Sequence, residues 1–531
     1  MKKISFLMTS DTHGYWLDRP INPNASLLNT AHVLNTIRQN NSHTTIAIDL
    51  GDFIQGSSFA TYCSQVAKNG DCFARAMNAL NYDFQIIGNH EFNFGSDYRN
   101  GILNQLNAQL LVSNIIDEQT NQPFMGQPYA IIEREGVKIG IVGVTTHYIP
   151  NWELPAHYAG LRFDDAFETT KYWCQQLRPQ VDVLVVAYHG GFECDLDTFE
   201  PLEDLTGENQ GVKMLQEISE IDVLLTGHQH RHINQKVNNT WAIQPGHAGE
   251  FVAEVVVSVD ENNRVVDSVG YLHDTASVST ESALVTVLEP QFSNGKLWLE
   301  TVLGQAPIVQ PTKELFQARL QGHPFVELLN QVQKEVTQAD FSGVALVNEF
   351  FALFEGNITN EILLKAYPYF NLIATVKLTG QEIYEVMAFD FEYYQLDETG
   401  AIAVNPSYIY PKPKHYNYDL YSGFTTHVDM TKDKRERIVS IIDERTGEPI
   451  ELDKEYTLAI SQYRAVGGGD YKMFTKDKIQ SISEIDIATA LVKALQTFDA
   501  AKWQQINQDY SHVIWHSGES ITVKDEVETC K

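Results

Sequence analysis

The stretch Phe84–Phe94, Phe-Gln-Ile-Ile-Gly-Asn-His-Glu-Phe-Asn-Phe, joins a short apolar run to a set of polar side chains that can bind metal. Its first four residues are typical of a buried strand. The run breaks at Gly88 and is followed by Asn89, His90 and Glu91. In open α/β sheets, ligand sites lie just beyond the carboxyl ends of the strands. The stretch therefore predicts an α/β fold with a site at this strand end, if other strands deliver matching ligands.

Four other apolar runs in the first half of the chain also end in polar clusters. These clusters are Thr9-Ser10-Asp11-Thr12-His13-Gly14, Asp49-Leu50-Gly51-Asp52, His189-Gly190-Gly191 and Gly227-His228-Gln229-His230. Each cluster alone is more readily explained by a turn, a loop or an exposed edge. Their repetition at strand ends predicts that they converge on one site. The mixture of carboxylate, amide and imidazole suits Mn²⁺, Zn²⁺ or Fe, and it is too rich in nitrogen for Ca²⁺.

The length and the pattern of the chain predict its domain organisation. A chain of 531 residues is too long for one ordinary core, so at least two domains are expected. Residues 1–275 alternate strand-like and helix-like patterns, which indicates a layered α/β domain. Residues 276–314 are predicted to be a linker with helical character, and residues 315–531 a second α/β domain. In that domain we predict helices over 325–336 and 487–498, the second preceded by a capping box at Ser483 and Asp486.

The composition excludes several classes of function. Hydrophobic residues make up 43% of the chain and charged residues 20%, as in soluble globular proteins. No apolar run approaches the roughly 18 residues that span a bilayer. The net charge of −31 argues against binding to a nucleic-acid polymer or to a membrane, because both require a basic patch. A small anionic substrate is still compatible with this charge if a local cationic centre, such as a metal cluster, overrides the general field.

The start of the chain and its cysteines bear on the compartment. Residues 1–8 contain two lysines and a short apolar run, but no small-residue cleavage site follows, and Asp11 and His13 come within a few residues. We therefore expect a first strand rather than a signal peptide, and a cytoplasmic location. The five scattered cysteines fit reduced thiols better than a disulfide framework.

In their order along the chain, the polar clusters resemble the metal-site motifs of the calcineurin-like metallophosphoesterases. The longer strings Thr9–Gly14 and Gly51-Asp52-Phe53-Ile54-Gln55-Gly56-Ser57 narrow the resemblance to the 5′-nucleotidase family, including its 2′,3′-cyclic-nucleotide phosphodiesterase/3′-nucleotidase branch. The resemblance implies a four-layer α/β/β/α catalytic domain followed by a C-terminal α/β substrate domain. It also implies a dinuclear centre of two divalent metal ions.

The resemblance assigns a role to each polar residue at the strand ends. One metal would be bound by Asp11, His13, Asp52 and His230, and the second by Asp52, Asn89, His189 and His228. Asp52 would bridge two cations that acidify a shared water and bind phosphoryl oxygens. His90 would stabilise the charge of the transition state or the leaving oxygen. Many 5′-nucleotidases pair this histidine with an aspartate, whereas this chain has Asn93, which we associate with the cyclic-nucleotide branch.

The second half resembles the substrate domain of the same family. The matching segments are Gly356-Asn357-Ile358-Thr359, Tyr367-Pro368-Tyr369-Phe370-Asn371, Leu378-Thr379-Gly380 and Gln462–Asp470. In the family two aromatic rings enclose the base, and such stacking contributes roughly 1–3 kcal/mol per base. Tyr463 matches one ring, and Phe424 or Tyr421 is expected to supply the other. Arg464 and Asn371 complete the predicted substrate-binding set.

The resemblance leaves two related activities open. The chain would hydrolyse nucleotide phosphate esters as a 5′-nucleotidase, or it would act as a 2′,3′-cyclic-nucleotide 2′-phosphodiesterase/3′-nucleotidase. The second is favoured by Asn93 and by the absence of the 5′-nucleotidase motif Asn-x-Gly-Gly-x-Arg, since the corresponding segment reads Leu346–Phe351. A non-catalytic nucleotide sensor is disfavoured because no metal ligand is missing. The expected partner is a small-molecule nucleotide, and the sequence makes no prediction of oligomeric state.

Overall fold

The structure is a computed structural model that describes residues 1–16, 26–278, 282–369, 371–410, 413–434 and 436–516. The chain divides into two compact units, Met1–Trp298 and Leu299–Lys531. We call them unit 1 and unit 2 and describe each by itself. The boundary between them falls inside the segment that the sequence predicts to be a linker. Among the helices of the described ranges, none combines the length and the apolar character needed to cross a membrane.

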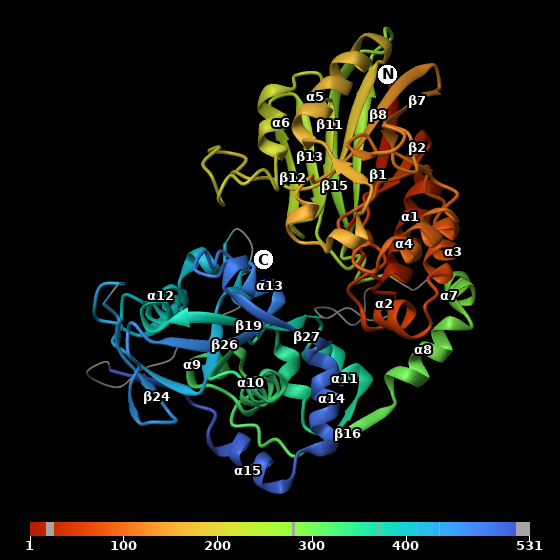
Figure 1. Cartoon of the computed structure of the whole chain (residues 1–531). Helices are drawn as coiled ribbons and strands as arrows, with labels where there is room; N and C mark the ends of the chain where they lie inside the picture. The colour runs from red at the N-terminus through yellow and green to blue at the C-terminus, as the bar shows by residue number, and fades with distance from the viewer. Residues whose placement is uncertain (17–25, 279–281, 370, 411–412, 435, 517–531) are drawn as a thin grey trace. The chain divides into compact units, whose positions relative to one another are not determined.

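Unit 1 is built on two six-stranded sheets (Figure 1). The first has the order β15 (Val265–Asp274), β14 (Phe251–Val259), β1 (Lys2–Thr9), β2 (Thr44–Asp49), β3 (Phe84–Gln85), β4 (Gln109–Leu110). The second has the order β12 (His232–Val237), β13 (Thr240–Pro245), β11 (Val223–Thr226), β10 (Val183–His189), β8 (Val137–Thr145), β7 (Tyr129–Arg134). Strands β1 to β4 are parallel to one another, as are β8, β10, β11 and β13.

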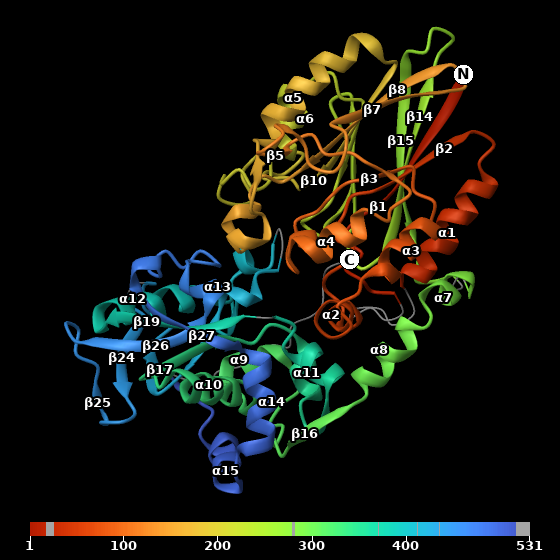
Figure 2. The same cartoon turned by 45° about the vertical axis from the view of Figure 1, so that its right-hand side comes forward.

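The two sheets of unit 1 share one core, and helices cover their outer faces. In β1, Ile4, Phe6 and Met8 lie in the core that also contains residues of β8 and β10, whereas Leu7 packs with the helices on the other face. This alternation follows the two-residue period of a strand. Helices α1 (Leu27–Asn40), α3 (Asp71–Ala79) and α4 (Ser96–Leu103) lie on one side, and α5 (Ala166–Leu177) and α6 (Gly211–Glu217) on the other (Figure 2). The predicted four-layer α/β/β/α fold is confirmed.

Smaller elements complete unit 1. A three-stranded sheet is formed by β5 (Ile115–Asp117), β6 (Gln122–Pro123) and β9 (Leu161–Phe163), and α2 (Ser58–Thr61) continues into a π-helical turn at Tyr62–Val66. Helices α7 (Ser282–Leu288) and α8 (Gln291–Leu299) flank Pro290, within the segment that the sequence predicts to have helical character. Leu284 and Leu288 of α7 are buried in the core of the helical layer over β1.

Unit 2 has a five-stranded and a four-stranded sheet. The first has the order β22 (Asp419–Ser422), β17 (Phe341–Ala345), β26 (Glu455–Ser461), β19 (Leu372–Thr379), β27 (Ile479–Asp486), and the second the order β25 (Glu448–Pro449), β24 (Ile438–Asp443), β23 (Phe424–Val428), β28 (Val513–Trp515). Its helices are α9 (Leu315–Gln321), α10 (Pro324–Thr337), α11 (Asn360–Ala366), α12 (Gly380–Asp390), α13 (Gln462–Ala465), α14 (Ile487–Thr497) and α15 (Ala500–Gln508). Two strand pairs, β16 (Val302–Ala306) with β18 (Gly356–Thr359) and β20 (Tyr394–Leu396) with β21 (Ile402–Val404), complete it.

Both helices predicted in the second half are present, as α10 and α14, but the predicted capping box is wrong. Asp486 alone caps α14, because its carboxylate accepts a hydrogen bond from the backbone N–H of Thr489. Ser483 lies within β27, where its hydroxyl donates to the carbonyl of Ile485. A strand that runs directly into the helix leaves Ser483 too far back to cap it. The capping box of unit 2 is at Thr379 and Glu382, at the start of α12.

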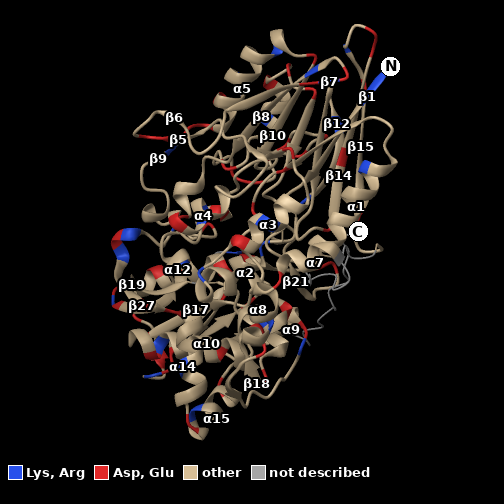
Figure 3. Ribbon diagram, turned by 90° about the vertical axis from the view of Figure 1, so that its right-hand side faces the viewer, with Lys and Arg blue, Asp and Glu red and all other residues tan. Residues whose placement is uncertain are grey.

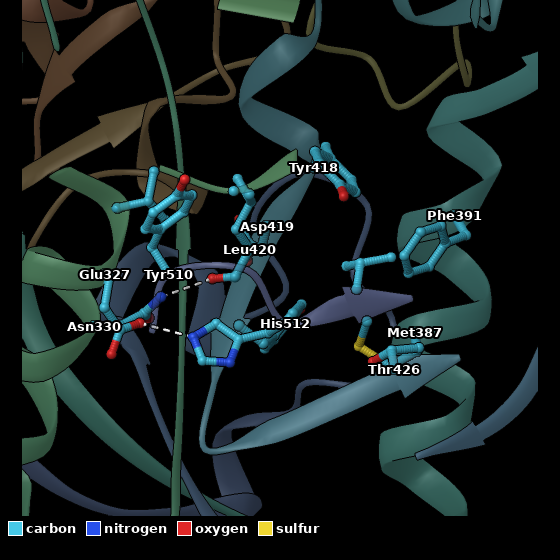
Figure 4. A pocket seen from close by; sticks show the side chains of 14 residues that line it. Glu327, Asn330, Met387, Phe391, Tyr418, Asp419, Leu420, Thr426, Tyr510 and His512 are labelled. Carbon is cyan, nitrogen blue, oxygen red and sulfur yellow. Dashed lines mark hydrogen bonds and ion pairs between the residues drawn. The ribbon is translucent and has the colours of Figure 1, made fainter. Parts of the chain in front are cut away.

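A small cavity lies in the interior of unit 2, between α10, α12 and β22 (Figure 4). Its volume of about 20 Å³ is enough for a single water molecule. The lining is mostly apolar, with Glu327, Asn330 and His512 on one side. The cavity is too small for a nucleotide or any comparable ligand.

Acidic residues outnumber basic ones, 69 to 38, and in the view of Figure 3 they lie on elements of both units rather than in one acidic segment. The four cysteines in the described part of the chain, Cys63, Cys72, Cys174 and Cys194, are free and buried. Cys530 lies outside the described residues.

Candidate metal centre

All seven predicted metal ligands lie at the carboxyl ends of strands of unit 1. Asp11 and His13 follow β1, Asp52 follows β2, and Asn89 comes shortly after β3. From the second sheet, His189 ends β10, while His228 and His230 lie in the loop after β11. The ligands thus come from both sheets and converge on one site, as the sequence predicts.

The structure brings these residues together as two adjacent groups. Asp11, His13 and His230 form one group and Asp52, His189 and His228 the other, with the ligand atoms of each group within 4.8 Å of one another. In the first group, Nε2 of His13 lies 3.0 Å from Nε2 of His230. In the second, Nε2 of His189 lies 3.2 Å from Oδ2 of Asp52. The side-chain oxygen of Asn89 joins the second group, 3.0 Å from Nε2 of His189 and 2.9 Å from Nδ1 of His228.

Hydrogen bonds on the far side of each ring orient three of the imidazoles. Nδ1 of His13 donates to the carbonyl of Gln55 at 2.9 Å, and Nδ1 of His189 donates to the carbonyl of Leu50 at 2.8 Å. Each ring therefore keeps its Nε2 lone pair for the centre. His228 is turned the other way: its Nε2 faces the carboxylate of Glu208 at 2.9 Å, which leaves Nδ1 for the centre. A partner that fixes the tautomer of a histidine is typical of metal ligands.

The donor atoms fit two divalent cations. Oδ2 of Asp52 is buried, and its polar contact among the residues that the structure describes is Nε2 of His189 at 3.2 Å, which does not have hydrogen-bond geometry. A buried carboxylate oxygen without a well-formed hydrogen bond suits a cation as its partner. Around it lie imidazole nitrogens and an amide oxygen, which are ligands that Mn²⁺, Zn²⁺ and Fe accept. Asp11 and Asp52 would supply the anionic ligands, and Asp52 lies in the second group with its other oxygen accepting from the backbone N–H of His90 at 2.7 Å.

The backbone of the centre is strained. Five of the seven predicted ligands, Asp11, His13, Asp52, His228 and His230, have φ between 50° and 69°. Residues other than glycine rarely adopt this left-handed conformation, and it costs on the order of 1–3 kcal/mol each. Such residues cluster at functional sites, where the surrounding structure holds them in place.

The ionisable groups of the centre are buried and close together, so they shift one another's pKa values. Burial opposes the ionised form of Asp52, but His189 and the other nearby imidazoles outweigh it and lower the pKa of the carboxyl. Burial likewise lowers the pKa of His189, yet the adjacent Asp52 raises it to about 10, so a metal bound at Nε2 would have to displace the proton that Asp52 stabilises there. Burial and the neighbouring His90 lower the pKa of His13 to about 4.

Glu91, to which the sequence assigned no role, connects two of the loops that carry the predicted ligands. Its carboxylate accepts hydrogen bonds from the backbone N–H groups of Asp52, Phe53 and Gly88. It is fully buried, and burial together with the charge of Asp52 raises its pKa to about 8. Glu91 therefore ties the loop after β2 to the loop after β3, and so fixes Asp52 beside Asn89.

His90 and Asn93 lie beside the centre as a hydrogen-bonded pair. Nδ1 of His90 is 2.6 Å from Oδ1 of Asn93, and the ring of His90 meets that of His13 edge to face at 5.2 Å. Because Asn93 occupies Nδ1, Nε2 is the nitrogen of His90 that is left for a substrate.

Two comparisons with protein families decide the assignment. Residues 4–232 match the calcineurin-like phosphoesterase family, and residues 302–476 match the 5′-nucleotidase C-terminal domain. The chain belongs to this two-domain family of metallophosphoesterases. It is therefore a hydrolase of phosphate esters, as the resemblance of its motifs implied.

Known metallophosphoesterases resemble the chain over most of its length. A trifunctional nucleotide phosphoesterase protein of Bacillus subtilis is 22% identical over 91% of the chain, which spans only 37% of that relative. A 2′,3′-cyclic-nucleotide 2′-phosphodiesterase/3′-nucleotidase of Yersinia enterocolitica is 25% identical over 87% of the chain and 80% of the relative. A crystal structure of a candidate 5′-nucleotidase from Staphylococcus aureus, in complex with α-ketoglutarate, is 29% identical with a TM-score of 0.87, covering 97% of this chain and 100% of that one.

In unit 2 of this metallophosphoesterase, two of the predicted substrate residues are placed differently from the prediction. Phe424 is 1% exposed and packs edge to face on Phe341, so it offers no face to a base. It alternates along β23 with outward residues, and this two-residue period turns it into the core. The alternative, Tyr421, is also buried and donates its hydroxyl to Asp390 at 2.6 Å.

Arg464 is likewise a structural residue of unit 2. Its guanidinium donates two hydrogen bonds to the carboxylate of Asp419, at 2.9 and 2.8 Å, and others to the carbonyls of Gly468 and Tyr416. With 4% of its surface exposed, Arg464 presents little of its guanidinium to solvent. These contacts tie α13 to β22, and the expected contact of Arg464 with substrate stays a prediction.

The other two predicted residues are accessible. Tyr463 is 40% exposed, and Asn371 is half-buried with its side chain hydrogen-bonded to Tyr367. The sequence missed Tyr369, which is 44% exposed. The signal was present in the matched segment Tyr367–Asn371, but nothing marked Tyr369 as the accessible ring.

Two side chains of one loop in unit 1 also escaped prediction. The ring of Trp152 stacks on that of His228 at 5.5 Å, and Glu153 accepts a hydrogen bond from Asn93. Neither belongs to a strand end, and no motif marks the loop. The same holds for Glu208, the partner of His228.

Proposed function

We propose that the chain hydrolyses phosphate esters of nucleotides at the metal centre of unit 1. The observation that supports this most strongly is the adjacent pair of ligand groups around Asp11 and Asp52, with imidazole lone pairs directed inward from both sheets. Two bound divalent cations would supply Lewis acidity and a nucleophilic water for in-line displacement at phosphorus. Their identity, Mn²⁺, Zn²⁺ or Fe, stays a prediction, as does the cytoplasmic location.

The side chains of unit 1 divide the remaining tasks. Asp52, held by Glu91 through its backbone N–H, fixes the spacing of the two groups. His90, with Nδ1 bound to Asn93, presents Nε2 to the phosphoryl group or the leaving oxygen. Trp152 covers one face of His228 and so limits its movement.

For the nucleoside we propose the exposed tyrosines of unit 2. Tyr463 and Tyr369 are accessible, with 40% and 44% of their surfaces exposed, and aromatic faces bind bases of any identity. This pair replaces the expected pair of Tyr463 and Phe424. Nucleotide substrates also accord with the relatives, whose names are those of nucleotide phosphoesterases.

A second candidate is 2′,3′-cyclic-nucleotide 2′-phosphodiesterase/3′-nucleotidase activity. Two observations favour it: the histidine partner is Asn93 rather than an aspartate, and the arginine that could have replaced the missing 5′-nucleotidase motif, Arg464, is buried. The Yersinia enterocolitica relative has this activity in its name.

A substrate panel tests the proposal and separates the two candidates. The purified chain, loaded in turn with Mn²⁺, Zn²⁺ or Fe²⁺, is assayed on AMP, 3′-AMP, 2′,3′-cyclic AMP and an aryl phosphate. A 5′-nucleotidase releases phosphate chiefly from AMP, whereas the alternative enzyme prefers the cyclic and 3′ esters. No turnover of any ester by the metal-loaded chain would refute the proposal.

The variant Asp52→Asn tests the role of the shared carboxylate. We expect loss of bound metal, measured by elemental analysis, together with a fall in kcat of at least about 100-fold, because a neutral amide does not hold two cations together. Asp260→Asn is the matched control, since Asp260 follows β14 at the opposite end of β1 from Asp11. An Asp52→Asn protein that keeps both metal and activity would contradict the assignment.

A further inference from the structure

A third side chain, the carboxylate of Glu153, is hydrogen-bonded to the His90–Asn93 pair. Nδ2 of Asn93 donates to Oε2 of Glu153 at 2.7 Å, while Oδ1 of Asn93 faces Nδ1 of His90 at 2.6 Å. His90, Asn93 and Glu153 therefore form a continuous hydrogen-bonded chain. Glu153 is 60 positions from Asn93 in the sequence, so only the fold reveals the contact.

The carboxylate decides which way the amide of Asn93 points. An ionised carboxylate only accepts hydrogen bonds, so Glu153 must face the NH₂ of Asn93 and not its oxygen. The oxygen of Asn93 is then directed at His90 and can only accept. Nδ1 of His90 must carry the proton, and in the neutral ring the lone pair is on Nε2. In this way the position of one carboxylate selects the tautomer of a ring two hydrogen bonds away.

Glu153 is itself held firmly. Its side chain is 8% exposed. Oε1 accepts from the backbone N–H of Leu154 and from Nδ1 of His157, both at 2.8 Å. The carbonyl of His157 in turn accepts from the buried guanidinium of Arg99 at 2.9 Å. A carboxylate fixed by these two donors provides a reference point for Asn93.

We propose that Glu153 is a positioning residue that fixes the tautomer and the orientation of His90 through Asn93. The proposal rests on the function proposed above for His90 and names the residue that takes over the orienting task of the missing aspartate. An aspartate at position 93 would orient His90 directly. The amide of Asn93 orients His90 only while the carboxylate of Glu153 accepts a hydrogen bond from its NH₂ group. The negative charge that orients His90 is therefore on Glu153 and not on residue 93.

An exchange of the two functional groups tests the proposal. In Asn93→Asp two carboxylates face each other at the 2.7 Å contact, which is repulsive. In the double variant Asn93→Asp with Glu153→Gln, the NH₂ of the new glutamine donates to the new aspartate, and the order of donors and acceptors is restored. We expect kcat to fall about 10- to 100-fold in Asn93→Asp at unchanged KM, and to recover at least about tenfold in the double variant.

Removal of the carboxylate gives the complementary result. In Glu153→Ala the amide of Asn93 is no longer held, and kcat is expected to fall about tenfold with metal content and KM unchanged. Glu133→Gln is the matched control for charge, because Glu133 pairs with Lys138 near the start of β8, at the end of the strand far from His189. Wild-type kcat in Glu153→Ala, or a double variant no faster than Asn93→Asp, would overturn the proposal.

A spectroscopic measurement keeps this test independent of turnover. In the zinc-loaded full chain labelled with ¹⁵N-histidine, His90 is assigned by its loss in His90→Gln. We expect its proton on Nδ1 in the wild type and a shift toward the Nε2–H form in Glu153→Ala. An unchanged tautomer would refute the role of Glu153. If no ester is hydrolysed at all, the proposed function fails while the tautomer still reports on the hydrogen-bonded chain.

Discussion

At the scale of single residues, the metal centre depends on close approach of two loops that carry its ligands. Gly51, with φ of 95°, and Gly88 lie against each other: a Cβ built on Gly51 would be 2.3 Å from the backbone nitrogen of Gly88. A Cβ on Gly88 would be 2.2 Å from Oδ1 of Asp52. Neither position tolerates a side chain, because the backbone of Gly88 fills the space beside Gly51, and the carboxylate of Asp52 fills the space beside Gly88.

The substitution Gly88→Ala tests this close approach. We expect Asp52 to be displaced, with a loss of about 1–3 kcal/mol in the free energy of unfolding from overpacking. A ligand displaced by about 1 Å should lower kcat about 100-fold and weaken metal binding. The measurements are urea unfolding, metal titration and phosphate release.

Gly101→Ala is the control for a glycine-to-alanine change. Gly101 lies in α4, and a Cβ there meets no atom within 4 Å. Alanine is favoured over glycine within a helix, so this variant should be unchanged or slightly more stable. Equal effects of the two substitutions would contradict the role assigned to Gly88.

Single residues also show where sequence reasoning ends. The seven ligands could be predicted because each lies within a few residues of the end of an apolar run and within a motif that resembles the family's metal site. Phe424 and Tyr369 carry no such mark. Both are aromatic residues in segments that match the family, yet one is 1% and the other 44% exposed. Exposure depends on the packing of segments far apart in the chain, and a local pattern does not record it.

At the scale of elements, the strand ends could be predicted, but not their distribution over two sheets. The apolar runs before Asp11, Asp52, His189 and His228 form β1, β2, β10 and β11 as expected. The first two belong to one sheet and the others to the facing sheet. Continuous apolar runs are alike whichever sheet they join, since each strand is buried on both faces. Strand order is therefore a property of long-range pairing.

A buried ion-pair cluster in unit 2 links α10 to the short strand β28. His512, just before β28, lies between two carboxylates: Nε2 is 3.0 Å from Glu327 of α10, and Nδ1 is 2.7 Å from Glu444 after β24 (Figure 4 shows Glu327 and His512). Two acceptors require two N–H donors, and only the protonated ring has both. Burial lowers the pKa of His512, but the two carboxylates outweigh it and raise the pKa from 6.5 to about 9.

The cluster predicts how the stability of unit 2 depends on pH. Because the folded pKa is above the unfolded one, the contribution is fully present below pH 6.5 and is lost as the pH rises through 9. The shift corresponds to on the order of 3 kcal/mol in the free energy of unfolding. Urea unfolding at pH 6 and at pH 10 measures it. His512→Gln should be less stable at pH 6 and should lose this pH dependence; an unchanged dependence would show that other groups cause it.

At the scale of the whole molecule, the chain has two units with separate cores. The apolar residues of unit 2 form one cluster, and those of unit 1 form clusters between and outside its two sheets. All seven metal ligands belong to unit 1, whereas Tyr369, Tyr463 and the His512 cluster belong to unit 2. Two cores of this kind are expected to unfold as separate cooperative units, each responding only to its own ligands and charges.

Calorimetry of the full chain tests this separation. Metal at about 100 times its Kd adds about 2.7 kcal/mol to the stability of the unit that binds it. We expect Mn²⁺ to raise the midpoint of one transition by several degrees and to leave the other in place, with no shift in Asp52→Asn. His512→Gln at pH 6 should lower the transition that metal leaves unchanged. If metal and His512→Gln moved the same transition, the two units would unfold as one, and binding at the metal centre would be coupled to the folding of the substrate domain.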